Sequence, residues 1–222
     1  MASTPYHHGN LRDALVEAAV EVVREGGPEA LSLRELARRV GVSHAAAYRH
    51  FADREALVDA VAERALEALT AAMERGLAEV DDDDPVRRAR RRLHATGAGY
   101  VEFAIAETGL FRLLFTAYPD PPEGKDGGKE GGKDSGEVGE DPYGMLNAAL
   151  DDLVDVGYLR PDVRLGADVT CWSAVHGFAV LNVEGPLRGL PPAERDRALE
   201  GLLLSIDRGL GVGGEWPELT AP

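Results

Sequence analysis

The sequence contains one cysteine, Cys171, and no long apolar run. A single cysteine excludes an intramolecular disulfide and any metal site built from several cysteines. No apolar run approaches the roughly 20 residues that a membrane-spanning helix needs, and the first residues, MASTPYHHGNLRD, lack the apolar centre of a signal peptide. We therefore expect a cytoplasmic protein without a membrane partner.

Positive charge is also scarce, because 24 Lys and Arg residues are opposed by 39 Asp and Glu residues and the formal net charge is -15. Such an acidic balance argues against diffuse attraction to nucleic acid or anionic membranes. The charge is unevenly distributed, since residues 1–55 hold 7 Arg and 8 Asp and Glu residues. The first quarter of the chain is therefore nearly neutral, and the remainder repels phosphate.

The first part of the chain has the periodicity of three helices. Asn10 is the expected N-cap of a helix that ends at Gly26-Gly27-Pro28 and has one apolar face, formed by Leu11, Leu15, Ala18 and Val22. Ser32 and Glu35 have the spacing of a capping box before the helix LRELARRV, in which Leu33, Leu36, Ala37 and Val40 form the inner stripe. After a turn at Gly41, Ser43 is placed to cap a short helix through His50.

The rest of the chain is also helical by pattern, and no window alternates as a strand would. Asp53 is expected to cap a helix over 54–78, and further helices are expected over 86–107, 110–118, 145–159, 165–185 and 193–210. These patterns predict an all-α chain with about nine helices in total. The glycine-rich segment 119–141 has almost no apolar residue, so we expect a flexible loop there.

The stretch GVSHAAAYRHF, residues 41–51, has the organisation of a helix-turn-helix. Helical spacing places Ala47 and Phe51 inward, His50 at the edge, and four side chains outward, those of His44, Ala45, Tyr48 and Arg49. Small residues at Ala45 and Ala46 would let the helix approach base edges, while Tyr48 and His50 would bond phosphate oxygens, with Arg34 and Arg54 flanking the same groove. Spacing alone leaves this interpretation open against an ordinary three-helix corner.

The residues from Ala14 to Val61, ALVEAAVEVVREGGPEALSLRELARRVGVSHAAAYRHFADREALVDAV, resemble the DNA-binding domain of the tetracycline-repressor (TetR) family, and the resemblance covers about residues 8 to 62. It implies that Tyr48 and His50 contact phosphates and that Arg34 contacts bases. Arg54 stands where the family usually has lysine. His44 and the paired alanines depart from the family's consensus, so the operator sequence does not carry over. The expected DNA-binding residues are Ser32, Arg34, Ser43, His44, Ala45, Ala46, Tyr48, Arg49, His50 and Arg54.

The second half of the chain contains Trp172, His176 and Gly177 in a Trp-x-x-x-His-Gly pattern, which is similar to a TetR C-terminal subclass named for those residues; ETGLFRLLFTA, residues 107–117, resembles a segment common in those regulators. The resemblance implies a helical ligand-binding and dimerisation domain, a homodimer formed through the last two helices, a double-stranded DNA operator and a small-molecule effector. The expected domains are residues 1–52 for DNA binding and 53–213 for ligand binding and dimerisation, followed by a C-terminal tail over 214–222.

Trp172 and His176 lie four residues apart on one helical stripe, where they could line an apolar pocket. The pocket residues expected are Tyr100, Phe103, Phe111, Leu114, Phe115, Met145, Trp172 and His176. The alternative is that they are ordinary core aromatics, with His176 bonded to a buried acceptor. Gly97 and Gly99 mark either a kink or a close helix crossing, and Cys171 is expected to be a buried small hydrophobe.

Other chemistry has little support in the sequence. The basic run Arg87–Arg92 follows the aspartates Asp81–Asp84, so we expect it to pair with acidic neighbours rather than with DNA. We expect no cofactor and no intrinsic metal. We also expect no enzyme activity, because His176, the candidate base, has no carboxylate on its own helical stripe. The leading hypothesis is a repressor released by a small, largely apolar effector; the alternative is a small-molecule-binding or protein-interaction module of the same fold that does not bind DNA.

Overall fold

The computed structural model describes residues 8–117 and 141–211. In these two ranges the chain forms ten α-helices and one short 3-10 helix, with no β-strand. The all-α prediction is therefore confirmed, with one α-helix more than the nine expected. The chain divides into two compact units, which we call the N-terminal unit (residues 1–68 and 106–128) and the C-terminal unit (residues 69–105 and 129–222).

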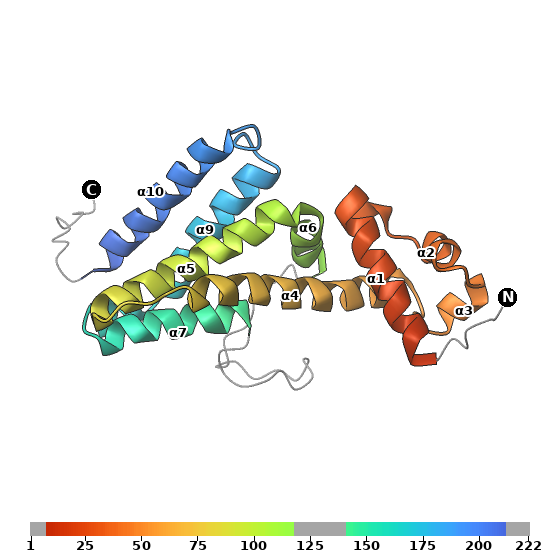
Figure 1. The fold of residues 1–222 in the computed structure, drawn as a ribbon, viewed down its shortest axis with the longest axis horizontal. Helices are drawn as coiled ribbons and strands as arrows, with labels where there is room; N and C mark the ends of the chain where they lie inside the picture. The colour runs from red at the N-terminus through yellow and green to blue at the C-terminus, as the bar shows by residue number, and fades with distance from the viewer. Residues whose placement is uncertain (1–7, 118–140, 212–222) are drawn as a thin grey trace, which may run out of the picture. The chain divides into compact units, whose positions relative to one another are not determined.

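The N-terminal unit contains α1 (His8–Gly26), η1 (Pro28–Ala30), α2 (Leu33–Val40), α3 (His44–Tyr48), α6 (Thr108–Ala117) and the first part of α4 (Arg54–Ala78) (Figure 1). Both α2 and α6 pack against α1, which is why α1 buries more than one stripe. Leu15, Ala19 and Val23 are fully buried there, whereas the predicted stripe residue Ala18 is only half-buried. The continuous helix α4 belongs to both units. The expected boundary between a DNA-binding and a ligand-binding domain at residue 52 stays a prediction.

One predicted cap in this unit is wrong, and a second is confirmed in position only. The helix α1 begins at His8, two residues before Asn10. Ser32 is the N-cap residue of α2, as predicted, but its side chain makes no capping hydrogen bond, and Glu35 forms an ion pair with Arg38 at 2.6 Å in place of the predicted capping box. The other two caps are confirmed, because Ser43 accepts from the Ala46 amide and Asp53 from the Ala56 amide at 2.9 Å.

The C-terminal unit contains the rest of α4 with α5 (Pro85–Ala106), α7 (Pro142–Asp155), α8 (Pro161–Arg164), α9 (Ala167–Val183) and α10 (Pro192–Leu210). The short α8 was not predicted, although Pro161 occupies a first-turn position that favours a helix start. The helix expected to run to Leu159 ends at Asp155. Gly157 there has a φ of 72°, and the amides of Tyr158 and Leu159 both donate to the Leu153 carbonyl.

The core of the C-terminal unit joins α5, α7, α9 and α10 around Leu150, Leu153 and Cys171. Cys171 is 3% exposed, and burial raises the pKa of its thiol to about 11, as expected for a small core residue. A Cβ on Gly99 would lie 2.8 Å from the Met73 Cα, and one on Gly97 would lie 2.8 Å from Leu203 Cδ2. These two glycines therefore mark close helix crossings of α5 with α4 and with α10.

Two expectations fall on residues outside those described. Residues 119–140 of the expected flexible loop and the expected tail over 214–222 are not described, although Asp141 is seen as the N-cap of α7. None of the helices in the two described ranges is long and apolar enough to cross a membrane.

Candidate nucleic-acid interface

The turn between α2 and α3 is fixed by local backbone bonds. Gly41 ends α2 with a φ of 75°, a left-handed conformation that costs glycine little, and the Val42 amide donates to the Ala37 carbonyl at 2.9 Å. Ser43 then begins α3 by accepting from the Ala46 amide at 3.2 Å. The five-residue helix α3 is therefore held at its start by a turn and a cap.

The two faces of α3 differ sharply in exposure. Ala47 is fully buried, and Phe51 just beyond the helix is 2% exposed. On the other side Tyr48 is 47% exposed, and its ring meets that of His44 edge-on with 5.0 Å between centroids. Ala45 and Arg49 are also exposed, while Ala46 and His50 are half-buried. The predicted orientation of α3 is confirmed, and its outer face is small at the front and polar and aromatic behind.

The arginines beside this face differ in their partners. Arg34 is exposed and makes no ion pair or hydrogen bond with any described residue, and the Arg49 guanidinium reaches only the Ala45 carbonyl, at 3.4 Å. Arg38 and Arg39 are instead held by glutamates. Arg54 donates to the carbonyls of Pro28, at 2.7 Å, and Leu31, so in this structure it ties the start of α4 to η1. Whether it also contacts DNA stays a prediction.

One arginine that the sequence patterns did not single out, Arg12 of α1, lies against a residue of the helix-turn-helix. Its Cζ lies over the Phe51 ring, 5.3 Å from the ring centroid. No sequence pattern points to this contact, because it joins two segments that only the packing of α1 against the following helices brings together. Ser32, which was predicted as a DNA contact, is exposed, and its side chain makes no hydrogen bond with a described residue.

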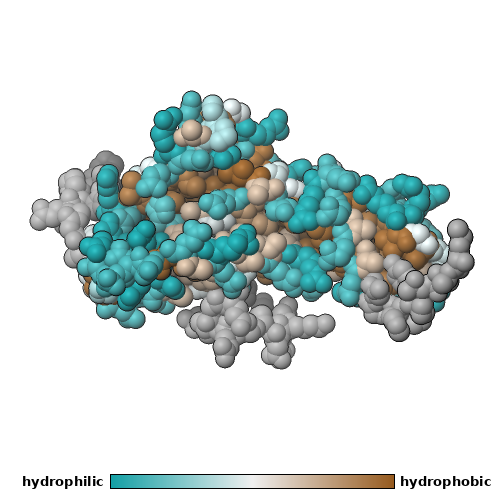
Figure 2. Space-filling view, in the orientation of Figure 1, coloured by the Kyte–Doolittle hydropathy of each residue, from teal (hydrophilic) through white to brown (hydrophobic). Residues whose placement is uncertain are grey.

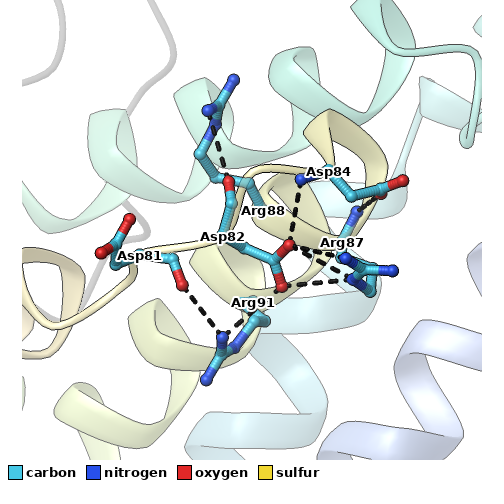
Figure 3. A network of polar contacts seen from close by, with 6 residues as sticks. All are labelled: Asp81, Asp82, Asp84, Arg87, Arg88 and Arg91. Carbon is cyan, nitrogen blue, oxygen red and sulfur yellow. Dashed lines mark hydrogen bonds and ion pairs between the residues drawn. The ribbon is translucent and has the colours of Figure 1, made fainter.

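The second basic segment, at the start of α5, is neutralised by aspartates (Figure 3). The Asp82 carboxylate accepts from Arg87 at 3.1 Å and lies 3.6 Å from Arg91, while Asp84 accepts from the Arg87 amide at 2.7 Å. The hydrogen bond from Arg87 is the main reason that the pKa of Asp82 is lowered. Arg88 donates to the Asp82 carbonyl and Arg91 to the Asp81 carbonyl.

Two further arginines of this segment reach distant carboxylates, Arg90 at Asp207 of α10 and Arg92 at Asp152 of α7. The expected pairing of the basic run with acidic neighbours is therefore confirmed.

The residues expected to line a ligand pocket are divided between the two units. Phe111, Leu114 and Phe115 belong to the N-terminal unit, where the rings of Phe111 and Phe115 meet edge-on at 4.9 Å. The other five belong to the C-terminal unit: Tyr100, Phe103, Met145, Trp172 and His176. Trp172, His176 and Phe115 are half-buried and the remaining five are buried. Their membership of one cavity stays a prediction.

Within the C-terminal unit, three of these side chains form a polar group in apolar surroundings. The Tyr100 hydroxyl lies 3.0 Å from His176 Nδ1, and the ring centroids of Trp172 and His176 are 5.7 Å apart. Burial raises the pKa of Tyr100, and a smaller opposite effect comes from its hydrogen bond with Trp172. Burial also lowers the pKa of His176, which favours the neutral ring and lets Nδ1 accept a hydrogen bond from the Tyr100 hydroxyl. His176 is thus bonded to a buried side chain, although Tyr100 is the donor here, whereas the alternative interpretation expected a buried acceptor.

Metal chemistry finds no support in residues 8–117 and 141–211, where no three His, Cys, Asp or Glu side chains are grouped to hold an ion.

Two family models match the chain over most of its helical part. One, described as bacterial regulatory proteins of the tetR family, matches residues 15–61, which contain α2, the turn and α3. The other, described as a tetracyclin repressor-like C-terminal domain, matches residues 93–206, about half of the chain. The chain belongs to the TetR family. Its all-α fold, with a DNA-binding helix-turn-helix followed by a larger helical part, is that of a TetR regulator.

Individual relatives share part of the sequence or the fold of the chain. The class C tetracycline repressor protein of Escherichia coli is 44% identical over 55 residues, a match that spans 25% of each chain. A solved protein of unknown function from Rhodococcus sp. RHA1 is 31% identical, with 95% of this chain and 100% of that one covered and a TM-score of 0.69. RolR, solved with resorcinol, is 18% identical, with 93% and 90% covered and a TM-score of 0.58, and shows the shared fold.

Proposed function

We propose that this TetR-family regulator is a homodimeric repressor that binds a palindromic DNA operator, is released from it by a small, largely apolar effector, and catalyses no reaction. The observation that carries the proposal is the exposed face of α3, with Ala45, Tyr48 and Arg49 turned to solvent above a buried Ala47 and Phe51. A capped helix with that pattern has an inner side fixed by the core and an outer side free for a ligand.

The outer face suits the major groove of DNA. The groove is about 12 Å wide and admits one helix. Ala45 and Ala46 keep the front of α3 small enough to approach base edges and to touch a thymine methyl group. Tyr48 and His50 supply donors for phosphate oxygens, while Arg34 and Arg49 are exposed guanidinium groups without a carboxylate partner in the described residues. Contacts to phosphates would fix the position of α3 along the duplex, and the front of the helix would set the sequence preference.

A dimer follows from the size of such an interface and from the surface of α9 and α10. One helix-turn-helix buries too little to be highly specific, and two recognition helices about 34 Å apart read two half-sites of a palindrome. Val169 and Leu181 of α9 are 56% and 43% exposed, and Figure 2 shows apolar surface where α9 and α10 lie. A Cβ on Gly177 or Gly201 would meet no atom within 4 Å, so a second copy has room to approach there.

The effector proposal rests on the polar group of Tyr100, Trp172 and His176. A mostly apolar site with a few fixed polar atoms is the usual composition of a small-molecule site, and these three side chains join α5 to α9. The resorcinol bound to RolR, a protein of the same fold, supports a small molecule as the ligand class. An effector that binds better to an arrangement of the helices unsuited to DNA lowers the affinity for the operator. The operator then lowers the affinity for the effector by the same factor.

The experiment that tests the proposal is footprinting of the full chain on DNA upstream of its own gene, at two salt concentrations. The expected result is a palindromic protected region whose affinity falls steeply as salt rises. Protein that binds no duplex in a salt-dependent and sequence-dependent manner, there or among fragments of the whole genome, would contradict the proposal and favour a module without DNA binding.

A further inference from the structure

Arg12 of α1 holds an unusual position for an arginine of this unit. It lies over the ring of Phe51, the residue that directly follows His50 at the end of the helix-turn-helix. A guanidinium over an aromatic face is attracted by the ring's electrons, and this attraction needs no N–H donor. The contact therefore holds the Arg12 head beside the rear of α3 while leaving its five N–H groups for other partners.

The other arginines of the N-terminal unit fall into two groups. Five are bonded to glutamates: Arg24, Arg38, Arg39, Arg64 and Arg112. Three others have, like Arg12, no carboxylate partner among the described residues: Arg34, Arg49 and Arg54. These three are already expected to contact DNA, and Arg12 is the fourth member of their group.

The carboxylates nearest to Arg12 in the sequence act elsewhere. The pKa of Arg64 on α4 is raised first by its hydrogen bond to Glu67 and then, more weakly, by the charges of Glu17 and Asp13. Neither Asp13 nor Glu17 forms an ion pair with Arg12. Arg12 is therefore an exposed arginine without an ion-pair partner among the described residues, on a chain whose net charge is -15.

We propose that Arg12 binds a phosphate of the DNA backbone, beside the phosphates bonded by Tyr48 and His50. The inference rests on the proposed function, since it adds a contact to the same DNA interface. A guanidinium that is already held in place loses less side-chain freedom on binding, and its planar fork matches two oxygens of one phosphate. Because phosphates carry no sequence information, Arg12 strengthens binding to every duplex alike.

The test compares three variants of the full chain with the wild type on one duplex, selected by the wild type from a random library. Arg12→Gln removes the charge and the fork, whereas Arg12→Lys keeps the charge. Arg64→Gln is the matched control, because it removes the same charge from the same unit at an arginine bonded to glutamate. Affinity is measured over a range of salt concentrations, and circular dichroism establishes that each variant is folded.

The slope of log affinity against log salt is expected to become shallower in Arg12→Gln. The expected change is about 0.9 for each phosphate that the protein no longer neutralises, or about two for a dimer. Arg12→Lys is expected to keep most of the wild-type slope, and Arg64→Gln all of it. The same fall in affinity is expected on a scrambled duplex.

Equal slopes for Arg12→Gln and Arg64→Gln would overturn the inference while leaving the DNA-binding function intact. If Arg12→Gln does not fold, Arg12→Met takes its place, because it removes the charge but keeps an unbranched apolar side chain against the Phe51 ring. A slope shallower by about two then supports the inference, and an unchanged slope overturns it. Failure of the wild type to select any duplex contradicts the proposed function and this inference together.

Discussion

Two arginine-rich parts of the molecule differ in what their side chains contact. At the start of α5, five of the six residues 87–92 are arginines, and four of them lie within ion-pair distance of an aspartate carboxylate. The fifth, Arg88, donates to the Asp82 carbonyl. Around α3 the arginines are fewer, yet Arg34 and Arg49 have no carboxylate partner among the described residues. The density of arginine in a sequence therefore says little about binding phosphate, whereas the absence of a carboxylate partner says much more.

The same comparison explains how an acidic protein binds DNA. Affinity for the backbone depends on phosphates neutralised by cations that are free to reach them. Paired arginines contribute little, because a carboxylate already neutralises them, and the net negative charge of the residues after 55 disfavours DNA there on average. On the proposed function, a small basic face on an acidic protein would favour one orientation of DNA.

The largest effect on operator affinity is expected when the predicted phosphate donors of α3 and the residue after it are removed. The double variant Tyr48→Phe, His50→Ala deletes two phosphate donors in each protomer while Ala47 and Phe51 stay buried. Since a hydrogen bond to a charged group contributes about 1.5–3 kcal/mol, operator affinity is expected to fall by at least about a hundredfold. Fluorescence anisotropy measures the affinity, and an unchanged unfolding midpoint is the control. A decrease of less than about threefold would contradict the role of these two residues.

The next prediction tests the comparison directly with two matched variants. Arg49→Ala is expected to weaken operator binding by about tenfold or more and to relax base preference at one position, because a good base contact contributes about 1–3 kcal/mol of discrimination. Arg87→Ala, which removes an arginine held by Asp82, is expected to change it less than about twofold. Competition with single-base operator variants measures both, and equal decreases for the two variants would undo the comparison.

A paired arginine is instead expected to matter for stability. Arg90 donates two hydrogen bonds to the Asp207 carboxylate, and its Cζ lies 4.8 Å from the centroid of the Tyr158 ring. Arg90→Met is expected to lower the free energy of unfolding by about 1–2 kcal/mol, a value reduced for the partial exposure of the pair. Arg208→Met is the control, since the exposed Arg208 has no bonded partner among the described residues. Urea titration measures both, and equal midpoints would show that the pair contributes nothing.

The smallest effect is expected on non-specific DNA binding, when arginines at the start of α5 lose their carboxylate partner and so resemble those around α3. Asp82→Asn removes the carboxylate that holds Arg87 and lies near Arg91, and leaves their charges free. Binding to an unrelated duplex at low salt is expected to rise by about two- to fivefold, with operator preference reduced accordingly. Asp155→Asn makes the same change in net charge at an exposed residue with no bonded partner among those described. If both variants raise non-specific binding equally, the pairing is irrelevant.

Much of the fold follows from local sequence patterns. Helix α4 has the predicted bounds, and the outward face of α3 is the one that helical spacing indicates, because an alanine and a phenylalanine in register specify a buried side. Ser43 and Asp53 act as caps because their partners lie three residues away. Where two local partners compete, the pattern fails, as at Glu35, whose carboxylate is taken by Arg38 rather than by the start of α2.

The site is less accessible to such reasoning wherever distant segments meet. Asp207 as the partner of Arg90, the Phe51 ring under Arg12 and the carbonyls bonded by Arg54 all depend on the packing of helices far apart in the chain. No periodicity of either segment encodes these contacts. The family resemblance indicates which part of the chain holds the helix-turn-helix, but only the geometry separates the arginines without a carboxylate partner from those that are paired.

Whether the exposed face of α3 reads DNA can be tested by selecting duplexes from a random library with the full chain and sequencing those recovered. We predict a palindromic motif whose half-sites lie about one helical turn apart, enriched by the wild type and not by the Tyr48→Phe, His50→Ala variant. Recovery of no motif, or of the same motif by both proteins, would contradict the claim that the exposed face of α3 reads DNA.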